Sequence, residues 1–388
     1  MALQPDKRLR IAVLSRHFSR HKGGAENYAV SLAEQLADEH EVHVYCQSHS
    51  NSHPSIQTHV MGLSMQKPRW VVMLIYSAWT FLHTRRGFDI VHSHENVFHG
   101  NVQTFHVKPV TYNLFHGKQG VSWWLTSLKV ATSPRLMAWL AVERARVRYA
   151  SNRLLIAASA LLKDLYIECF DLPQTHVQVI TPGVAMPKPL SATDTLLAKQ
   201  AARQQLGLTG SGQWLLMVGH DYGKKGLTAL LQAMVLLPEG MSLAVVGDTS
   251  QIPEWQSKAN QLGLQHRVVF LGQQTQMDPV YQACDVFVHA TLEDVFPIVV
   301  LEAMAHGLPV VVSPAPYCLS SNLLSPDEHA LILQDPHDAA ALAKHIERVQ
   351  ADSELASHLV ANAKAYVQRY RWDALAKTQL NMYRELLS

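Results

Sequence analysis

Two acidic residues eight positions apart, Asp294 and Glu302, lie where an α/β protein could bind a sugar or a phosphate. The surrounding segment, Asp285–Gly307, has the pattern of a buried strand, a polar turn (Thr291–Val295) and a helix. Pro297 suits the first helical turn, because its missing N–H is not needed there. A helix N-terminus at the carboxyl end of a parallel strand binds anions, and flanking carboxylates can grip hydroxyls. Taken alone, the local pattern favours simpler roles, an N-cap for Asp294 and a solvated helix position for Glu302.

A second candidate group is basic. Lys224 and Lys225, flanked by Gly223 and Gly226, follow the strand pattern 214–219 and come at the start of a helix. Lysines at the positive end of a helix dipole would meet a phosphate. The sequence G-x4-G-K-[ST] is absent, so the segment is not a Walker motif.

A glycine pair, Gly23 and Gly24, separates the first strand pattern (9–15) from a helix. Two glycines there let backbone N–H groups approach a ligand closely, although a tight turn alone would explain them. The spacing is not G-x-G-x-x-G, so a dinucleotide fingerprint is not supported.

Histidines gather in the first half of the chain. His92, His94 and His99 are close in sequence, and His106 ends the strand pattern 102–106. Alternate histidines on a strand can share a metal, but no acidic or cysteine partner has ligand spacing, so no metal is expected. His106, at the carboxyl end of a strand, is an active-site candidate or a loop cap.

Alternation of short apolar strands with helices indicates an α/β fold built of doubly wound parallel sheets. The Pro-rich segment after residue 183 breaks regular structure and is the best linker candidate. We therefore expect an N-terminal domain, a linker region, a C-terminal domain and a closing helix that packs back on the N-terminal domain, at residues 1–183, 184–212, 213–365 and 366–388.

Composition and charge limit the class of protein. Four scattered cysteines without a CxxC pair indicate a reducing compartment, and no signal peptide is recognised at the start. Residues 1–183 hold 19 Lys/Arg against 12 Asp/Glu, which suits an anionic substrate or membrane surface, or is a chance asymmetry. The apolar run 70–82 is too short to span a bilayer and fits a core helix or an interfacial one. Segment 108–148 mixes tryptophans with basic residues, which fits a membrane headgroup region or a solvated helix pair equally.

Several stretches together resemble one family. KGGAE, DIVHSH, TFH, VGHDYGKKG, VVFLG, YQACDVFVHA and LEDVFPIVVLEAMAHGLPVVVS are similar to the motifs of family-4 retaining glycosyltransferases over nearly the whole chain. Within that family, VGHDYGKKG is most similar to enzymes that glucosylate the lipopolysaccharide core. The resemblance implies a GT-B architecture, in which two Rossmann-like domains face a cleft.

The resemblance also implies roles for individual residues. Asp294 replaces the family's first glutamate and would contact the donor sugar, while Glu302 would hold the ribose hydroxyls. Lys225 matches the lysine that neutralises the diphosphate, whereas His220 replaces the accompanying arginine and Lys224 could supply the missing charge. The remaining implied contacts are the glycine pair, the histidine that faces the transferring sugar, and the backbone after the first acid, where Pro297 replaces a glycine: Gly23, Gly24, His106, Phe296, Ile298 and Val299.

These expectations describe one activity. The chain would be a cytoplasmic, peripheral membrane enzyme that moves glucose from UDP-glucose onto a lipid-linked glycan such as lipopolysaccharide core. It would need no cofactor, metal or nucleic acid, and its partners would be the nucleotide-sugar, the acceptor and an anionic membrane met through 108–148. The alternatives are another family-4 donor or acceptor, a GT-B sugar-nucleotide epimerase, and a silent sugar-nucleotide-binding protein.

Overall fold

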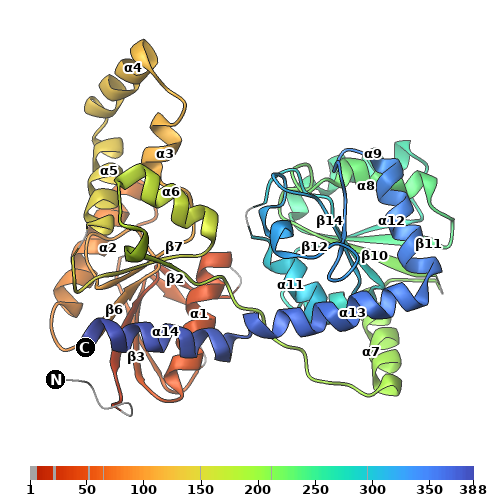
Figure 1. The fold of residues 1–388 in the computed structure, drawn as a ribbon, viewed down its shortest axis with the longest axis horizontal. Helices are drawn as coiled ribbons and strands as arrows, with labels where there is room; N and C mark the ends of the chain where they lie inside the picture. Colours follow the sequence, from red (N-terminus) through yellow and green to blue (C-terminus); the bar gives the residue numbers. More distant parts are fainter. Residues whose placement is uncertain are drawn as a thin grey trace. The chain divides into compact units, whose positions relative to one another are not determined.

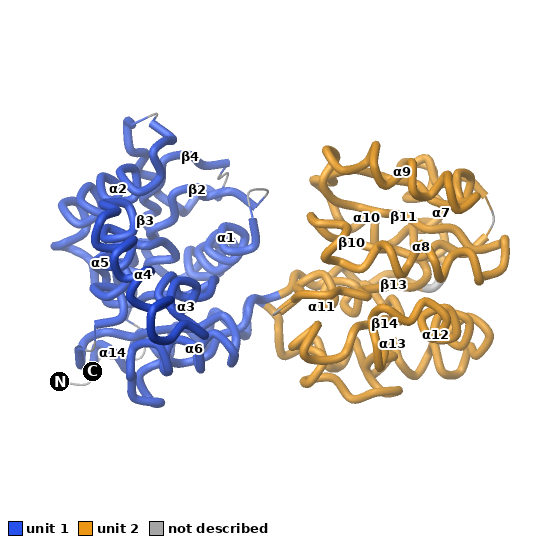
Figure 2. The backbone as a smooth tube through the Cα atoms, turned by 90° about the horizontal axis from the view of Figure 1, so that it is seen from above, with its two compact units in different colours: residues 1–183, 372–388 blue, residues 184–371 orange. Residues whose placement is uncertain are grey.

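The computed structural model describes residues 7–20, 23–50, 53–63, 65–148, 150–210, 212–294 and 296–388. The chain forms two compact units (Figure 2), which are Met1–Gly183 with Trp372–Ser388, called unit 1, and Val184–Arg371, called unit 2.

Unit 1 is built on a parallel sheet with the strand order β5-β3-β1-β6-β7-β8-β9 (Figure 1). Its strands are β1 (Arg10–Leu14), β3 (Glu41–Cys46), β5 (Ile56–Val60), β6 (Ile90–Ser93), β7 (Val102–Phe105), β8 (Leu154–Ala157) and β9 (Val177–Val179). A separate pair joins β2 (His17–Phe18) to β4 (Ser48–His49). The chain builds outward from β1 to β5 and then restarts on the other side of β1 with β6, which makes the sheet doubly wound.

Unit 1 also has helices, most of which pack on this sheet. They are α1 (Gly24–Ala37), α2 (Arg69–Thr84), α3 (Val110–Phe115), α4 (Gly120–Ala131), α5 (Pro134–Val147), α6 (Ala160–Phe170), the short η1 (Gln174–His176) and α14 (Trp372–Leu387). The last helix joins the core through Ala376, Leu380 and Tyr383, which pack with Tyr28 and Leu32 of α1. This contact explains why the end of the chain belongs to unit 1.

Unit 2 repeats the doubly wound plan with the strand order β12-β11-β10-β13-β14-β15. Its strands are β10 (Gln213–Val218), β11 (Met241–Val246), β12 (Val268–Gly272), β13 (Val286–His289), β14 (Val310–Val312) and β15 (Leu331–Ile332). The parallel direction of these strands and the near-complete burial of β10, β11, β13 and β14 explain their near-continuous apolar sequences. The winding reverses between β10 and β13, the point at which such sheets bind ligands.

Helices pack on both faces of the second sheet. They are α7 (Ala192–Gln205), α8 (Leu227–Leu236), η2 (Thr249–Gln251), α9 (Ile252–Gln261), α10 (Asp278–Ala283), α11 (Ile298–Ala305), η3 (Leu319–Leu323), α12 (Ala339–Ala351), α13 (Ser353–Val367) and η4 (Gln368–Tyr370). One core cluster joins α8, α9 and α12 to the sheet, and a second joins α7, α10, α11 and α13 to the other face. The α/β class with two doubly wound parallel sheets is therefore confirmed.

Some boundaries differ from the sequence interpretation. The region 184–212, expected as a linker, contains α7, whose Ala202 packs into a core cluster of unit 2. The chain returns to unit 1 at Trp372, not at 366. Strand β5 was not predicted, because IQTHV has only its first residue fully buried and so lacks an apolar run. Val295, at the end of the expected polar turn, lies outside the described residues.

Two segments singled out for membrane contact form ordinary helices. The run 70–82 lies in α2, which buries Val72, Met73 and Tyr76 against the sheet and exposes Leu82. Segment 108–148 forms α3, α4 and α5. Helix α4 extends away from the sheet of unit 1 (Figure 1), whereas the C-terminal end of α5 packs on it, where Arg146 donates to Gln103 and Thr104 of β7. Within the described ranges, no helix combines the length and apolarity needed to cross a membrane.

Candidate active site

The loops that follow β10 and β13 touch at the carboxyl edge of unit 2, where the sheet winding reverses. Leu292 donates its backbone N–H to the carbonyl of Lys224 over 2.8 Å, and the Thr291 hydroxyl donates to the same oxygen over 3.2 Å. Gly226 adopts φ +80°, and a Cβ there would lie 1.8 Å from the Ala290 carbonyl oxygen. Only glycine allows this approach, so the sequence GKKG brings the basic loop against the acidic one.

Lys225 and Asp294 form the centre of this edge. The Lys225 Nζ lies 2.5 Å from Asp294 Oδ2 and donates to the carbonyl of Glu293 over 3.2 Å. Both side chains are largely buried, with 21% and 16% exposed. His289, at the end of β13, lies 3.1 Å from the same Asp294 oxygen through Nε2.

The charges of this triad follow from its surroundings. Burial alone would raise the pKa of Asp294, but the bond from His289 and the charge of Lys225 outweigh it and lower that pKa. Burial lowers the pKa of His289, which opposes the effect of Asp294, so the imidazole is neutral at pH 7. Its buried Nδ1 has no partner among the described residues, which favours the tautomer in which Nε2–H donates to Asp294. His289 thus orients the carboxylate.

Two further expected residues lie in the same loops but are more open. Lys224 forms an ion pair with Glu293 at 3.2 Å, with both side chains more than half exposed. Such a pair is weakly held and can exchange for a ligand charge. His220 is exposed, and its carbonyl accepts a hydrogen bond from Gln251 over 2.8 Å. Lys224 and His220 are therefore close to Lys225 in sequence, but neither side chain contacts the Lys225 side chain in the described structure.

The start of α11 supplies backbone N–H groups beside Asp294. Pro297 is the N-cap, followed by Ile298 and Val299, whose N–H groups precede the regular hydrogen bonding of the helix. Phe296 turns its ring toward Tyr370, with centroids 6.0 Å apart, and packs at the margin of the apolar core. Only backbone atoms of Phe296 are therefore candidates for ligand contact.

Glu302 has a partner that the sequence did not suggest. Tyr281 of α10 donates its hydroxyl to Glu302 Oε2 over 2.7 Å. Burial raises the pKa of Glu302, although the tyrosine bond opposes the shift. A second carboxylate oxygen remains for a ligand hydroxyl, so Tyr281 can orient Glu302 without blocking it.

Gly23, Gly24 and His106 belong to unit 1, whereas the other expected site residues belong to unit 2. Gly23 is the N-cap of α1, and both glycines are exposed. A Cβ on Gly24 would meet nothing within 4 Å, so its small size is not required by packing. The pair lies after β1 at the winding reversal of the first sheet, where exposed N–H groups can face a ligand.

His106 lies in a buried histidine network. Its Nε2 is 3.1 Å from His94 Nδ1, and its ring packs edge-on against Tyr28 with centroids 5.1 Å apart. Burial, together with the charge of Arg146, lowers the pKa of His106 to about 3. The imidazole is therefore neutral and suits hydrogen bonding, not ionic binding.

His92 connects this histidine cluster to α14, the last helix of the chain. Tyr383 of α14 lies 2.6 Å from His92 Nδ1, and His92 Nε2 lies 2.7 Å from the Thr104 hydroxyl.

Within the described ranges, no group of three or more His, Cys, Asp or Glu side chains could hold a metal ion.

The sequence interpretation missed three residues that contact expected site residues: His289, Tyr281 and His94. His289 and Tyr281 occur inside apolar runs that predict core, and His94 was considered only as a metal ligand. The available signal for His289 and His94 was their place at or just after a strand end, because the carboxyl ends of strands face the site in a doubly wound sheet. Tyr281, inside the short helix α10, gave no such signal.

Family models match both halves of the chain. Residues 22–186 match the model described as Glycosyltransferase Family 4, and residues 198–366 match the model described as Glycosyl transferases group 1. One match falls in unit 1 and the other in unit 2, apart from a few residues, and together they include all the expected site residues. The chain belongs to the family-4 glycosyltransferases.

Curated relatives are similar over part of their length. A D-inositol 3-phosphate glycosyltransferase from Xylanimonas cellulosilytica is 31% identical over 245 residues, which are 60% of this chain and 57% of that protein. The lipopolysaccharide glucosyltransferase WaaG of Escherichia coli strain K12 is 24% identical over 60% of this chain and 62% of its own. The matched region thus spans about three fifths of each relative.

Solved structures of the family share the whole fold. A crystal structure of WaaG matches with a TM-score of 0.76 and 20% identity, over 96% of this chain and 99% of that one. Anabaena HepE in complex with UDP matches with a TM-score of 0.71 and 19% identity, over 97% and 100%. The GT-B fold is therefore confirmed for this family-4 glycosyltransferase.

Proposed function

We propose that the protein is a retaining glycosyltransferase that moves a hexose, glucose from UDP-glucose, onto a lipid-linked glycan such as the lipopolysaccharide core. The observation that carries this proposal is the buried Lys225–Asp294 pair, held at 2.5 Å at the winding reversal of unit 2. It joins a cation for a diphosphate to a carboxylate for a sugar, which is the combination a nucleotide-sugar requires.

Lys225 would stabilise the leaving diphosphate. An ammonium has three N–H donors, and Asp294 and the Glu293 carbonyl use two of them. The third is available to a phosphate oxygen, and the N–H groups of Ile298 and Val299 add the positive end of α11. These fixed groups act on the charge that builds as the sugar–phosphate bond breaks. The exposed Lys224 would add charge in place of the arginine that His220 replaces.

The two carboxylates would position the donor. Asp294, kept ionised and oriented by His289, would accept hydrogen bonds from the hexose hydroxyls. Glu302, oriented by Tyr281, would hold the ribose hydroxyls. Gly23 and Gly24 would contribute backbone N–H groups, and His106 a neutral side chain, from unit 1.

Retention of configuration fits this set of groups. We propose same-face substitution, in which the leaving phosphate takes the proton of the acceptor hydroxyl while the new glycosidic bond forms. No protein nucleophile or metal ion is needed for that step, because Lys225 and the α11 N–H groups neutralise the leaving group.

The acceptor side is supported by helix α4. Trp124, Leu125 and Leu128 are 71%, 62% and 62% exposed. Lys129 lies in the last turn of the helix, and Lys118 lies just before its N-cap, Gln119. Exposed aromatic and aliphatic side chains beside lysines suit the headgroup region of an anionic membrane. We therefore propose a peripheral enzyme at the inner face of the cytoplasmic membrane.

Relatives support the donor more directly than the acceptor. WaaG is named as a lipopolysaccharide glucosyltransferase, and HepE has been solved with UDP. The Xylanimonas relative is named for D-inositol 3-phosphate, a soluble acceptor, so the acceptor class needs a direct comparison.

The test is a transfer assay with UDP-glucose and three acceptors: a lipopolysaccharide core lacking glucose, D-inositol 3-phosphate and water. We expect glucose on the core with the α configuration of the donor, read from the anomeric coupling by NMR. Inverted product, transfer only to inositol phosphate, or epimerised UDP-sugar without acceptor would each contradict the proposal.

A further inference from the structure

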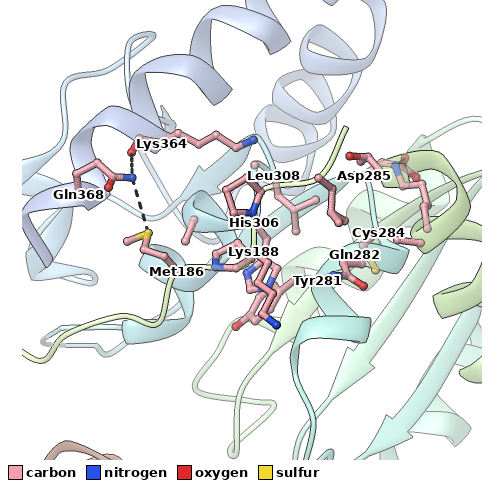
Figure 3. Close-up of a pocket in the computed structure, with 18 of the residues that line it drawn as sticks. Met186, Lys188, Tyr281, Gln282, Cys284, Asp285, His306, Leu308, Lys364 and Gln368 are labelled. Carbon is pink, nitrogen blue, oxygen red and sulfur yellow. Dashed lines mark hydrogen bonds and ion pairs between the residues drawn. The ribbon is translucent and has the colours of Figure 1, made fainter. Parts of the chain in front are cut away.

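Unit 2 contains a large cavity at the edge of the sheet opposite the candidate donor site (Figure 3). Its volume is about 540 Å³, within the range of small-molecule sites. Cys284 and Asp285, just before β13, and Gly307 and Leu308, just before β14, form part of its wall. These residues mark the amino edge of the strands, whereas Lys225 and Asp294 lie at the carboxyl edge, so the cavity is a separate place.

The cavity carries an excess of positive charge. Its wall includes Lys188, Lys199 and Lys364, against the single carboxylate of Asp285. That carboxylate is already satisfied, because Lys199 lies 2.5 Å and Arg203 2.7 Å from its two oxygens. The backbone N–H of Trp214 also donates to it over 2.7 Å. Asp285 therefore does not neutralise the positive charge of Lys188 or Lys364.

Lys188 and Lys364 come from different segments and border the same space. Lys188 lies in the extended segment after the chain enters unit 2, and Lys364 lies on α13 (Figure 3). Lys364 crosses the turn at Gly307, where an added Cβ would lie 2.8 Å from Nζ. Neither ammonium forms an ion pair within the described part of the chain, so both are available to an anion.

The floor of the cavity is linked to Glu302. Tyr281 and His306 line the cavity and stack with ring centroids 4.8 Å apart. Tyr281 donates to the Glu302 carboxylate over 2.7 Å, and His306 Nδ1 lies 2.8 Å from the Glu302 carbonyl oxygen. A ligand that contacts this stacked pair would therefore act on the residue that we assign to the ribose.

We propose that this cavity binds a small phosphate-bearing anion, attracted by the charges of Lys188 and Lys364 in its wall, and that its occupancy changes nucleotide affinity through Tyr281 and Glu302. The two uncompensated positive charges in the wall offset the double negative charge of a phosphate, and a volume of about 540 Å³ also accommodates an organic group attached to it. The binding part is independent of the proposed function, whereas the effect on nucleotide affinity rests on it.

The binding experiment follows thermal unfolding of the full chain with inorganic phosphate and with glucose 1-phosphate, at constant ionic strength. The variants are the double substitution Lys188→Ala/Lys364→Ala, the donor-site substitution Lys225→Ala, and the charge-matched control Lys344→Ala/Lys377→Ala, whose lysines are exposed on α12 and α14. Phosphate stabilises many proteins by exclusion from their surface, and the control double variant measures that effect.

We expect saturable stabilisation that the Lys188→Ala/Lys364→Ala variant loses and that the Lys225→Ala variant and the control keep. A lower dissociation constant for glucose 1-phosphate would identify an organic phosphate as the ligand, and equal constants would identify free phosphate. Stabilisation that survives in Lys188→Ala/Lys364→Ala, or that Lys225→Ala abolishes, would overturn the site.

The coupling experiment measures the dissociation constant of UDP with and without saturating phosphate. If the two sites are coupled, phosphate bound in the cavity changes the dissociation constant of UDP, and UDP changes that of phosphate by the same factor. We expect the UDP constant to change by at least about threefold in the wild type and not to change in Lys188→Ala/Lys364→Ala. Tyr281→Phe, which keeps the ring but removes the bond to Glu302, should abolish the change while phosphate still binds. An unchanged UDP constant in the wild type would overturn the coupling, whereas a complete failure of UDP to bind would count against the proposed function and leave phosphate binding to be judged by the first experiment.

Discussion

The Lys225 ammonium is fixed by two hydrogen bonds, one to the Asp294 carboxylate and one to the Glu293 carbonyl. Its third N–H remains available as a donor to a ligand. Lys225→Ala should lower kcat by about 10²–10³-fold, the usual effect of losing one fixed donor to a developing charge. The measurement is steady-state transfer from UDP-glucose.

The neighbouring Lys224 provides the matched control for that prediction. Lys224→Ala removes the same charge from an exposed pair, so its effect should be about tenfold or less. Equal losses in the two variants would show that only the net charge of the loop matters, and would contradict a specific contact by Lys225.

The histidines of unit 1 should make stability depend on pH. Burial lowers the pKa of His92 and of His106 to about 3, against an ordinary value of about 6.5 in the unfolded chain. The unfolded state therefore binds more protons below pH 6.5, and the free energy of unfolding falls as the pH drops from about 6.5 toward about 3. Each histidine contributes a slope of up to about 1.4 kcal/mol per pH unit.

Urea unfolding at several pH values between 7.5 and 5 checks this dependence. His92→Asn should lower stability at pH 7.5, because it removes the bonds to Tyr383 and Thr104, but should give a shallower dependence on pH. An identical slope in wild type and His92→Asn would mean that His92 does not stay neutral in the folded protein.

At the scale of elements, the site depends on how closely the loop after β10 approaches the loop after β13. Gly226→Ala would place a methyl group 1.8 Å from the Ala290 oxygen at a residue with φ +80°, so the loops must separate. The left-handed conformation alone costs about 1–2 kcal/mol for an alanine, and the clash adds to it.

Denaturant unfolding compares this variant with Gly240→Ala, which meets nothing within 4 Å and has no positive φ. We expect Gly226→Ala to lose more than about 1 kcal/mol and Gly240→Ala less than half of that. A similar effect of the two substitutions would show that the approach of the loops is not tight.

Helix α4 makes its own prediction. If its exposed face meets a membrane, Trp124→Glu/Leu128→Glu should reduce binding to vesicles containing anionic lipid by at least about tenfold, since burying one large apolar side chain contributes about 1.5–3 kcal/mol. Leu236→Glu, on an exposed position of α8 in unit 2, is the control and should bind normally. Equal binding of all three proteins in a sedimentation assay would remove α4 from the membrane contact.

At the scale of the whole molecule, periodicity predicted the sheets well. The strand patterns at 9–15 and 214–219 are found as β1 (Arg10–Leu14) and β10 (Gln213–Val218), because strands buried on both faces are near-continuous apolar runs. Short or half-exposed strands such as β5 carry no such signal. The helix α7 was missed because its residues are mostly exposed, which makes its sequence similar to that of a linker.

The site could be predicted only in part. The spacing of Asp294 and Glu302 and the position of Lys225 are local in sequence and were found. The contacts from His289, Tyr281 and His94 join side chains through the fold, and each of these residues is buried, so its local pattern indicates core. The roles of these residues in the donor site are predictions, and measurements of nucleotide binding and sugar transfer test them.

The most direct test of the donor site is thermal unfolding of the protein with UDP, GDP, ADP and CMP, alongside Lys225→Ala. A ligand at 100 times its dissociation constant adds about 2.7 kcal/mol to the free energy of unfolding, which is readily measured. Our account predicts a UDP-selective stabilisation that is strongly reduced in Lys225→Ala. No stabilisation by any nucleotide, or an equal one in the variant, would contradict it.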